Sequence, residues 1–258
     1  MQIDLEKVKE IVRGTKPLFM DRERSSQIKV KGLADFVTQV DIQVQEKVQK
    51  ELEALYPEIQ FMGEEKDNSS IDFSKDVWIL DPVDGTTNLI HDFRNSTLSL
   101  ALCQGGELTL GIVYHPYSDE LFLAQRGKGA WLGEKQIHVS EISDMGQSLI
   151  SIGTSPYYRE LTDENFAVFK EVFAHSADIR RLGSAALELA YVACGRIDAY
   201  FEQYLKPWDY AAGLLLIEEA GGTVTDYEGN PIDVTKVAKI VGSNGVIGNV
   251  LVQEYLNK

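Results

Sequence analysis

The sequence predicts an α+β protein whose two sub-domains share one cleft. Apolar residues recur with helical spacing through about the first 55 residues, and residues 96–139 contain short apolar strands joined by tight turns. After about residue 145, strands and apolar helices alternate, which is typical of α/β structure. We therefore expect an N-terminal sub-domain over 1–145 with an antiparallel sheet, and a C-terminal α/β sub-domain over 146–258, with no linker between them.

The first part of the chain predicts two helices. Residues 4–20 carry apolar residues on one helical face, and residues 30–37 predict a loop or hairpin around Gly32. Thr38 and Asp41 match a capping box, so a second helix begins there and ends at Tyr56-Pro57. Its apolar stripe is expected in the core: Val40, Val44, Val48, Leu52 and Leu55.

The remaining elements follow from alternation and turn residues. The predicted strands cover residues 59–62, 77–80, 97–102, 111–114, 120–124, 149–152, 197–201 and 223–225. The predicted helices cover residues 164–175, 184–194 and 210–220. The polar segment 66–76 predicts a surface loop.

Charge and composition exclude some classes of protein. The chain has 25 basic and 40 acidic residues, a formal charge of −15, which argues against a broad surface for nucleic acid or an anionic membrane. Cys103 and Cys194 lie among apolar residues and predict free thiols in a reducing compartment. The start of the chain lacks a signal-peptide pattern, and no apolar run reaches the ~18 residues of a membrane span. These features predict a cytoplasmic protein.

Asp81 and Asp84 stand directly after the strand at 77–80 and carry the main chemical signal. Pro82 stiffens the loop, Gly85 permits a sharp bend, and the run Thr86-Thr87-Asn88 can cap a following helix. A helix N-terminus binds anions, and paired carboxylates bind hard cations. Together they indicate metal-assisted chemistry on a phosphate, although Asp-Pro and Asp-Gly are also common turn dipeptides.

Other acidic residues are ambiguous when taken singly. Glu64 and Glu65 could be a solvated pair, Asp209 a helix N-cap, and Glu202 a solvent-facing side chain. The four histidines share no ligand spacing, so zinc is not expected: His91, His115, His138 and His175. Oxygen ligands alone favour Mg²⁺, and several carboxylates on separate loops favour more than one ion.

Four segments together resemble the signatures of the inositol monophosphatase family, and the similarity extends over nearly the whole chain. They are Asp35-Phe36-Val37-Thr38-Gln39-Val40-Asp41, Gly63-Glu64-Glu65, the run from Trp78 to Asn88, and Trp208-Asp209-Tyr210-Ala211-Ala212-Gly213. The resemblance implies a layered αβαβα sandwich, Mg²⁺-dependent hydrolysis of phosphomonoesters, inhibition by lithium and a homodimer.

The resemblance also implies a ligand set. Glu64, Asp81 and the carbonyl of Val83 would hold one Mg²⁺, and Asp81, Asp84 and Asp209 would hold a second. Glu64 would also reach a third, weaker ion. Two ions would activate a water molecule and stabilise the leaving oxygen.

Roles in catalysis and substrate binding are implied in the same way. Thr86, paired with Asp41 and helped by Glu64, would orient and deprotonate the attacking water. The backbone N–H groups of Gly85 and Thr86, next to Asp84, would bind phosphate oxygens. Substrate contacts would come from Glu202, Ser184 and Ala185.

Inositol monophosphate, or a similar small sugar or polyol phosphate, is the expected substrate, cleaved to alcohol and phosphate by direct attack of water. The 2′-phosphate of NADP(H) and fructose-1,6-bisphosphate stay open, because Lys206 could recognise a second anionic group. Nucleotide 3′-phosphates also stay open, although the compact chain lacks obvious insertions for an adenine pocket. The 66–76 loop is expected to border the entrance. A regulatory binding protein with the same fold is the alternative of another class; loss of a metal acid would favour it, and none is missing.

Overall fold

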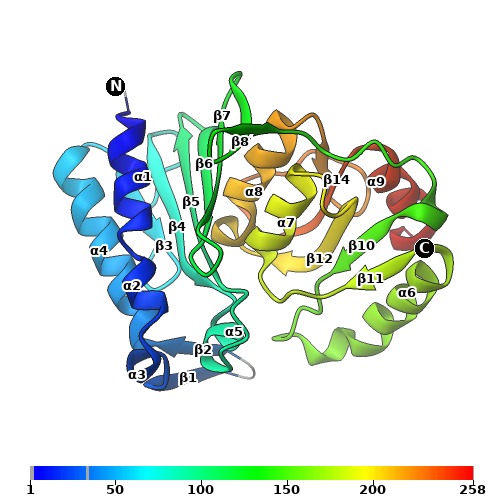
Figure 1. Ribbon diagram of the computed structural model, residues 1–258, viewed down its shortest axis with the longest axis horizontal. Coiled ribbons are helices and arrows are strands. Elements are labelled where there is room, and N and C mark those ends of the chain that lie inside the picture. The colour runs from blue at the N-terminus through cyan, green and yellow to red at the C-terminus, as the bar shows by residue number, and fades with distance from the viewer. Residues whose placement is uncertain (1–2, 33–34, 258) are drawn as a thin grey trace.

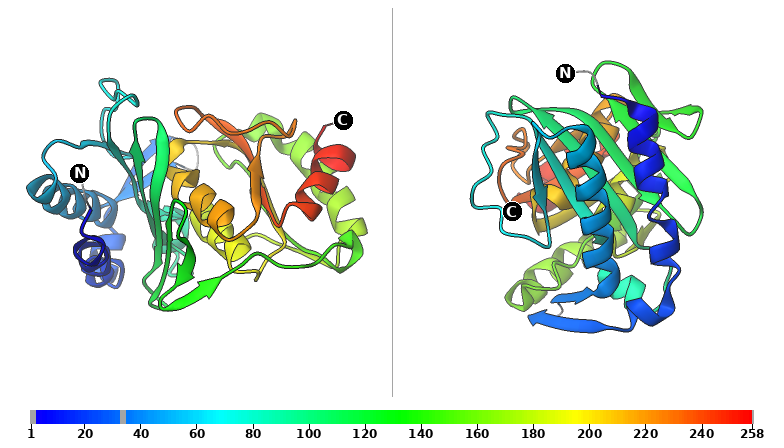
Figure 2. Two further views of the ribbon diagram at one scale, coloured as in Figure 1. Left: turned by 90° about the horizontal axis from the view of Figure 1, so that it is seen from above. Right: turned by 90° about the vertical axis from the view of Figure 1, so that its left-hand side faces the viewer.

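The computed structural model describes residues 3–32 and 35–257, which form five alternating layers of helices and sheets (Figure 1). Two helices cover the outer face of a seven-stranded sheet, two more lie between that sheet and a five-stranded one, and two cover the far face (Figure 2). In that order they are α1 (Leu5–Arg13) with α4 (Gln39–Leu55), α7 (Ala185–Ala193) with α8 (Pro207–Glu219), and α6 (Thr162–His175) with α9 (Val246–Leu251). The expected αβαβα sandwich is confirmed.

The seven-stranded sheet has its strands in sequence order, and each pair except β3–β4 is antiparallel. Its strands are β3 (Gln60–Gly63), β4 (Val77–Asp84), β5 (Thr97–Gln104), β6 (Glu107–His115), β7 (Glu120–Gln125), β8 (Gly129–Leu132) and β9 (Lys135–Ile137). The short turns between them, read from the sequence, explain this meander.

Both faces of this sheet are covered, which explains the unbroken apolar run at the start of β4. Trp78 and Leu80 pack toward α1 and α4, whereas Val77 and Ile79 pack toward α7 and α8. Alternate side chains of a strand point to opposite faces, so a strand buried on both sides is apolar throughout. This burial on both faces holds β4 in place, and the end of the strand carries Asp81 and Asp84.

The five-stranded sheet has the order β11-β10-β12-β14-β13, with β11, β10 and β12 parallel and the other pairs antiparallel. Its strands are β10 (Leu149–Ile152), β11 (Asp178–Arg180), β12 (Ala199–Leu205), β13 (Thr223–Thr225) and β14 (Ala238–Ser243). Sequence patterns missed β11, β14 and α9. A three-residue strand such as β11 is too short to show alternation.

The N-terminal part differs from expectation in two respects. The single helix expected over 4–20 is broken at Gly14, and a second short helix, α2 (Lys16–Phe19), follows. Pro17 lies in the first turn of α2, where its missing N–H group costs nothing, so it begins a helix rather than ending one. Leu55 is 44% exposed at the last position of α4, so its assignment to the core was wrong.

Three short elements join these helices to the rest. Helix α3 (Arg22–Ser25) precedes β1 (Ile28–Gly32), which pairs antiparallel with β2 (Asp35–Thr38). The pairing confirms a hairpin, and its turn lies outside the described residues. β2 leads directly into the capping box of α4, where Thr38 and Asp41 bond as predicted.

Glycines allow the central helices to lie very close to their neighbours. A Cβ atom on Gly111 of β6 would stand 2.7 Å from the carbonyl oxygen of Ala212, on α8. One on Gly213 of α8 would stand 2.5 Å from Cβ of Leu189, on α7. These distances are far below van der Waals contact. Only glycine at both positions therefore lets α8 pack this closely against the sheet and α7.

Both cysteines are free thiols, and Cys103 is buried. Across residues 3–32 and 35–257, the model contains no helix with the length and apolar character of a membrane span.

Candidate metal and phosphate site

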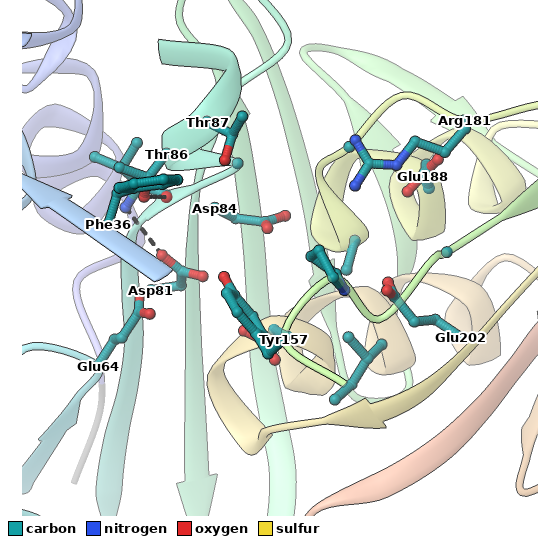
Figure 3. A pocket seen from close by; sticks show the side chains of 18 of the residues that line it. Phe36, Glu64, Asp81, Asp84, Thr86, Thr87, Tyr157, Arg181, Glu188 and Glu202 are labelled. Carbon is teal, nitrogen blue, oxygen red and sulfur yellow. Dashed lines mark hydrogen bonds between the residues drawn. The ribbon is translucent and has the colours of Figure 1, made fainter. Parts of the chain in front are cut away.

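Four acidic side chains from distant parts of the chain line one pocket of about 480 Å³. The pocket lies where β4 ends, between the N-terminal ends of α5 (Thr86–Ile90), α7 and α8 (Figure 3). The four are Glu64 after β3, Asp81 and Asp84 in the last turn-forming part of β4, and Asp209 in the first turn of α8.

The end of β4 is shaped by Asp81 and Gly85. Pairing with β5 is irregular between Asp81 and Asp84, and Oδ1 of Asp81 accepts a hydrogen bond from the N–H of Val83 at 2.9 Å. Gly85 has φ = +87°, and a Cβ there would approach the carbonyl oxygen of Gly183 to 2.8 Å. A glycine is therefore required on both grounds.

The cap expected from Thr86-Thr87-Asn88 is not formed by their side chains. Gly85 occupies the N-cap position of α5 and makes no side-chain cap. Asn88 instead donates hydrogen bonds to the carbonyl oxygens of Asn95 and Leu182. The side chain of Asn88 thus joins α5 to the segment that precedes α7.

Asp84 is held by the start of α7. Its Oδ2 accepts hydrogen bonds from the hydroxyl of Ser184 at 2.6 Å and from the N–H of Ala186 at 2.7 Å. Ser184 is also the N-cap of α7 and is buried, so it stands behind the pocket, whereas Ala185 lines it. The geometry gives Ser184 the task of positioning Asp84.

Replacing Ser184 by alanine is expected to lower both stability and activity. Loss of the cap should cost about 1 kcal/mol in the free energy of unfolding. Loss of the hydrogen bond to Asp84, a metal ligand predicted from the sequence, should reduce kcat/KM about ten-fold. Thermal melting and phosphate release measure the two effects, with Ser184→Thr as the matched control that keeps the hydroxyl. A loss of stability with unchanged kcat/KM would show that Ser184 only caps α7 and does not position Asp84 for catalysis.

Asp209 and Glu64 each present a carboxylate oxygen with no partner among the described residues. Asp209 is the third residue of α8 rather than its N-cap, and its Oδ2 accepts from the N–H of Lys206 at 2.7 Å. No described residue donates a hydrogen bond to the half-buried carboxylate of Glu64. Glu65 is occupied elsewhere by an ion pair with Lys31, so Glu64 is the member of the pair that faces the pocket.

Burial and mutual repulsion raise the pKa values of these acids. Burial, followed by the charge of Glu65, raises the pKa of Glu64 to about 8. Burial likewise raises the pKa of Asp84 to about 6. The pKa values of Asp81 and Asp209 are raised by burial first and then by the charge of Glu64. Cations between the carboxylates would remove this repulsion.

The donor set fits a hard divalent cation in kind, although the side chains are not drawn together around a single point. In the part of the chain that the model describes, no three Asp, Glu, His or Cys residues form a compact metal-binding group. The acids instead line the walls of the pocket, with unpartnered oxygens on Glu64 and Asp209. Oxygen ligands of this kind suit Mg²⁺.

Thr86 lines the pocket and forms a hydrogen-bonded pair with the buried Asp41 behind it. The hydroxyl of Thr86 lies 2.9 Å from Oδ1 of Asp41 and 3.1 Å from the carbonyl oxygen of Val83. The other oxygen of Asp41 accepts from the N–H and the hydroxyl of Thr38. Burial raises the pKa of Asp41, which makes its carboxylate a better proton acceptor.

Glu202 lies in the opposite wall rather than facing solvent, the simpler possibility left open by the sequence. It is buried, and its carboxylate accepts hydrogen bonds from the hydroxyl of Tyr200 at 2.5 Å and the N–H of Ser155 at 2.7 Å. A carboxylate fixed in this way can accept further hydrogen bonds from a ligand's hydroxyl groups.

Sequence patterns missed several residues of the pocket, three of which carry polar side chains of interest. Tyr157, Arg181 and Glu188 all line it, and the hydroxyl of Tyr157 points toward the acids (Figure 3). Of these, only Glu188 could have been found from the sequence, because a carboxylate within an otherwise apolar, buried helix is rare and indicates a specific role. Its Oε1 accepts from the hydroxyl of Ser151 and the N–H of Leu182.

The 66–76 loop does not border the pocket, contrary to expectation. None of its residues lines it, and Phe73 packs against the core under the loop. The side chain of Asn68 forms hydrogen bonds with both backbone groups of Gly63, which ties the loop to the end of β3. Tyr157, Arg159 and Phe36 do line the pocket.

Comparison with known proteins identifies the family of this chain. The model of the inositol monophosphatase family matches residues 3–257. The chain is 40% identical to the inositol-1-monophosphatase of Rhizobium meliloti over 203 residues, 79% of this chain and 76% of the relative. It is 41% identical to the Nus factor SuhB of Xylella fastidiosa over 202 residues, 77% of this chain and 72% of the relative.

A solved structure is similar over almost the full length. The extragenic suppressor protein suhB from Bartonella henselae has a TM-score of 0.91 and 33% identity, covering 96% of both chains. Fold and site together define a metal-dependent phosphatase. The chain belongs to the inositol monophosphatase family, whose members are Mg²⁺-dependent phosphatases.

Proposed function

We propose that the chain hydrolyses inositol monophosphate, or a similar small polyol phosphate, to the free alcohol and inorganic phosphate. The observation that carries this choice is the position of Glu202. Its buried carboxylate lines the same pocket as the four acids and can accept hydrogen bonds from hydroxyl groups of the alcohol. A polyol offers such hydroxyls beside the phosphate, with Ala185 packing against its carbon skeleton.

Glu64, Asp81, the carbonyl of Val83, Asp84 and Asp209 would hold two Mg²⁺ ions, with Glu64 also within reach of a third. Bound Mg²⁺ lowers the pKa of water and neutralises charge on the phosphoryl group. The N–H groups of Gly85 and Thr86, next to Asp84, would orient the phosphate oxygens.

The chain's own proton acceptor would be the Thr86–Asp41 pair. With its hydrogen directed to Asp41, the hydroxyl oxygen of Thr86 keeps lone pairs free to accept a proton from the attacking water. Asp41, with its raised pKa, can take the hydroxyl proton in turn. Glu64 faces the same pocket and would help to orient the water.

Thr86→Ala should lower kcat by about 10² to 10⁴, the usual range for a general base, with a smaller effect on KM. Thr86→Ser keeps the hydroxyl and should retain most of the activity. Steady-state phosphate release for the two variants makes the comparison. Equal kcat values for the alanine and serine variants would exclude the hydroxyl from proton transfer.

A phosphate-release panel tests the substrate assignment. Inositol 1-phosphate, fructose-1,6-bisphosphate, NADP and nucleotide 3′-phosphates are compared with and without Mg²⁺, and with lithium added to the Mg²⁺ reactions. We expect the highest kcat/KM with inositol 1-phosphate, no turnover without Mg²⁺ and inhibition by lithium. A clear preference for NADP or a bisphosphate would instead indicate that Lys206 binds a second anionic group of the substrate.

A regulatory binding role is the second candidate, because one relative with 41% identity is named a Nus factor. A chain that acted by contact alone would release no phosphate from any member of the panel. The complete set of acids in the pocket supports catalysis over this alternative. We also propose a homodimer, which light scattering on the purified protein would detect.

A further inference from the structure

One wall of the acidic pocket carries charged side chains that the proposed reaction does not use. Arg181 and Glu188 line this wall beside Glu202, across the pocket from Glu64 and Asp81 (Figure 3). Glu188 lies in the first turn of α7, and Arg181 lies in the segment just before that helix. The two side chains therefore reach the pocket from one end of a buried helix, next to Glu202, where the alcohol part of a substrate would lie.

The carboxylate of Glu188 is buried, but only one of its oxygens has partners. The residue is 1% exposed, and Oε1 accepts hydrogen bonds from the hydroxyl of Ser151 at 2.8 Å and from the N–H of Leu182 at 2.7 Å. Within the two described ranges, 3–32 and 35–257, no group donates to Oε2. Carboxylates are seldom buried without full partners, because leaving water costs free energy that hydrogen bonds must offset. A ligand in the pocket can supply the missing donor.

Arg181 is a cation near these carboxylates that does not bind them directly. Its guanidinium lies against Gly183, where an added Cβ would stand 2.4 Å from Nη1, and it donates a hydrogen bond to the hydroxyl oxygen of Thr154 at 3.3 Å. Burial raises the pKa values of Glu188 and Glu202, and the charge of Arg181 partly offsets this. Arg181 nevertheless forms no ion pair with any carboxylate that the model describes. Opposite charges that lie close without contact leave room for a bridging group.

The mixture of charges on this wall limits what can bind there. A second anion would be repelled by Glu188 and Glu202, and a cation would be repelled by Arg181. A hydroxyl group is uncharged, and it can accept a hydrogen bond from a guanidinium and donate one to a carboxylate at the same time. Each oxygen of Glu202 has one donor already, Ser155 or Tyr200, and keeps a lone pair for a further hydroxyl.

We propose that Arg181 and Glu188 form a second hydroxyl subsite beside Glu202, and that they determine selectivity for alcohols that carry several hydroxyl groups. One hydroxyl of the substrate would accept from Arg181 and donate to Oε2 of Glu188, while a neighbouring hydroxyl donates to Glu202. The inference rests on the proposed phosphomonoesterase activity and extends it by naming residues that recognise the far side of the polyol.

The test compares two phosphate esters that differ only in hydroxyl groups. These are inositol 1-phosphate and cyclohexyl phosphate, which has the same six-membered carbon ring with no hydroxyls. The full-length protein is assayed with saturating Mg²⁺ at about pH 9, where Glu188, whose pKa burial raises to about 8, is mostly charged. Arg181→Met and Glu188→Gln should each lower kcat/KM for inositol 1-phosphate about ten-fold, mainly through KM, because a hydrogen bond to a charged group is lost. Both variants should leave cyclohexyl phosphate within about two-fold.

Matched variants separate recognition from general damage. Arg180→Met removes the neighbouring guanidinium, which pairs with Asp178. Arg180 lines neither this pocket nor the smaller one beside it, of about 250 Å³, which Tyr204 lines, so neither substrate should be affected. Glutamine at position 188 keeps an oxygen that can accept from Ser151 and Leu182, so α7 should stay in place, and thermal melting of each variant checks this.

The outcomes distinguish the subsite from simpler roles. If Glu188 only held the turn before α7 and Arg181 were only a surface cation, neither substitution would distinguish the two esters. Unchanged kcat/KM for inositol 1-phosphate in both variants, or equal losses on both esters, would therefore overturn the subsite and leave the proposed function standing. A larger loss on fructose-1,6-bisphosphate than on inositol 1-phosphate would show that Arg181 binds a second phosphate, and would also overturn it. No hydrolysis of inositol 1-phosphate by the unmodified chain would contradict the proposed function itself.

Discussion

Asp84→Asn is expected to lower kcat/KM about a thousand-fold or more without unfolding the protein. The substitution removes one charge from the proposed cation ligands, whose contribution to the transition state is several kcal/mol. Asparagine keeps an oxygen that can accept from Ser184 and Ala186, so the start of α7 should stay in place. Phosphate release with inositol 1-phosphate and thermal melting without metal measure the two parts of the prediction.

Asp67→Asn is the matched control for charge. Asp67 is an exposed acid in the 66–76 loop, which lines neither pocket, and its replacement should leave kcat/KM unchanged. Activity of Asp84→Asn within ten-fold of the unmodified chain would remove Asp84 from the ligand set. A large fall in melting temperature would show instead that its main task is to join β4 to α7.

Mg²⁺ is expected to stabilise the fold, and its removal should make stability depend on pH. At 100 times its Kd, a ligand that binds only the native state adds about 2.7 kcal/mol, which for a chain of this size is a rise of roughly 5–10 °C in Tm. The pKa values of Glu64 and Asp84 are raised to about 8 and about 6 from ordinary values of 4.5 and 3.8. The metal-free native state therefore binds more protons than the unfolded chain between about pH 4 and 8.

The sign of the pH effect follows from that difference. With respect to these groups, the metal-free protein should be most stable below about pH 4, and its stability should fall as pH rises through 6 and toward 8. Saturating Mg²⁺ should flatten this slope, because bound cations favour the charged carboxylates. Differential scanning fluorimetry in EDTA and in Mg²⁺ across this range gives both curves. Identical curves would mean that no divalent cation binds among these acids.

Much of the fold could be predicted because local patterns and packing agree. The meander from β5 to β9 has short turns and apolar strands, and α4 has both a capping box and an apolar stripe. The failures have local causes. β11 is only three residues long, and Pro17 reads equally well as a helix stop or as a helix start. Leu55 fits the stripe in the sequence, but it is the last residue of α4 and is exposed.

The candidate site could be predicted in its charged residues but not in its walls. Asp81, Asp84 and Asp209 stand beside turn and helix-start signals and were found as a set through the resemblance. Tyr157 belongs to an irregular segment without periodicity, and only the tertiary structure brings its ring to the pocket. The positive φ of Tyr204 could not be predicted either, because in a sequence only glycine commonly indicates the left-handed region.

The close approach of α8 to its neighbours has a consequence for how this chain can vary. Gly111 and Gly213 lie in the packed interior. A methyl group on either would clash with a neighbouring element and displace α8 from its present position. Asp209, a proposed cation ligand, lies in the first turn of that helix, so we expect such a shift to weaken cation binding as well as stability. Substitutions at these interior positions should therefore affect activity although neither residue contacts a ligand. The core should tolerate fewer substitutions than stability alone would require.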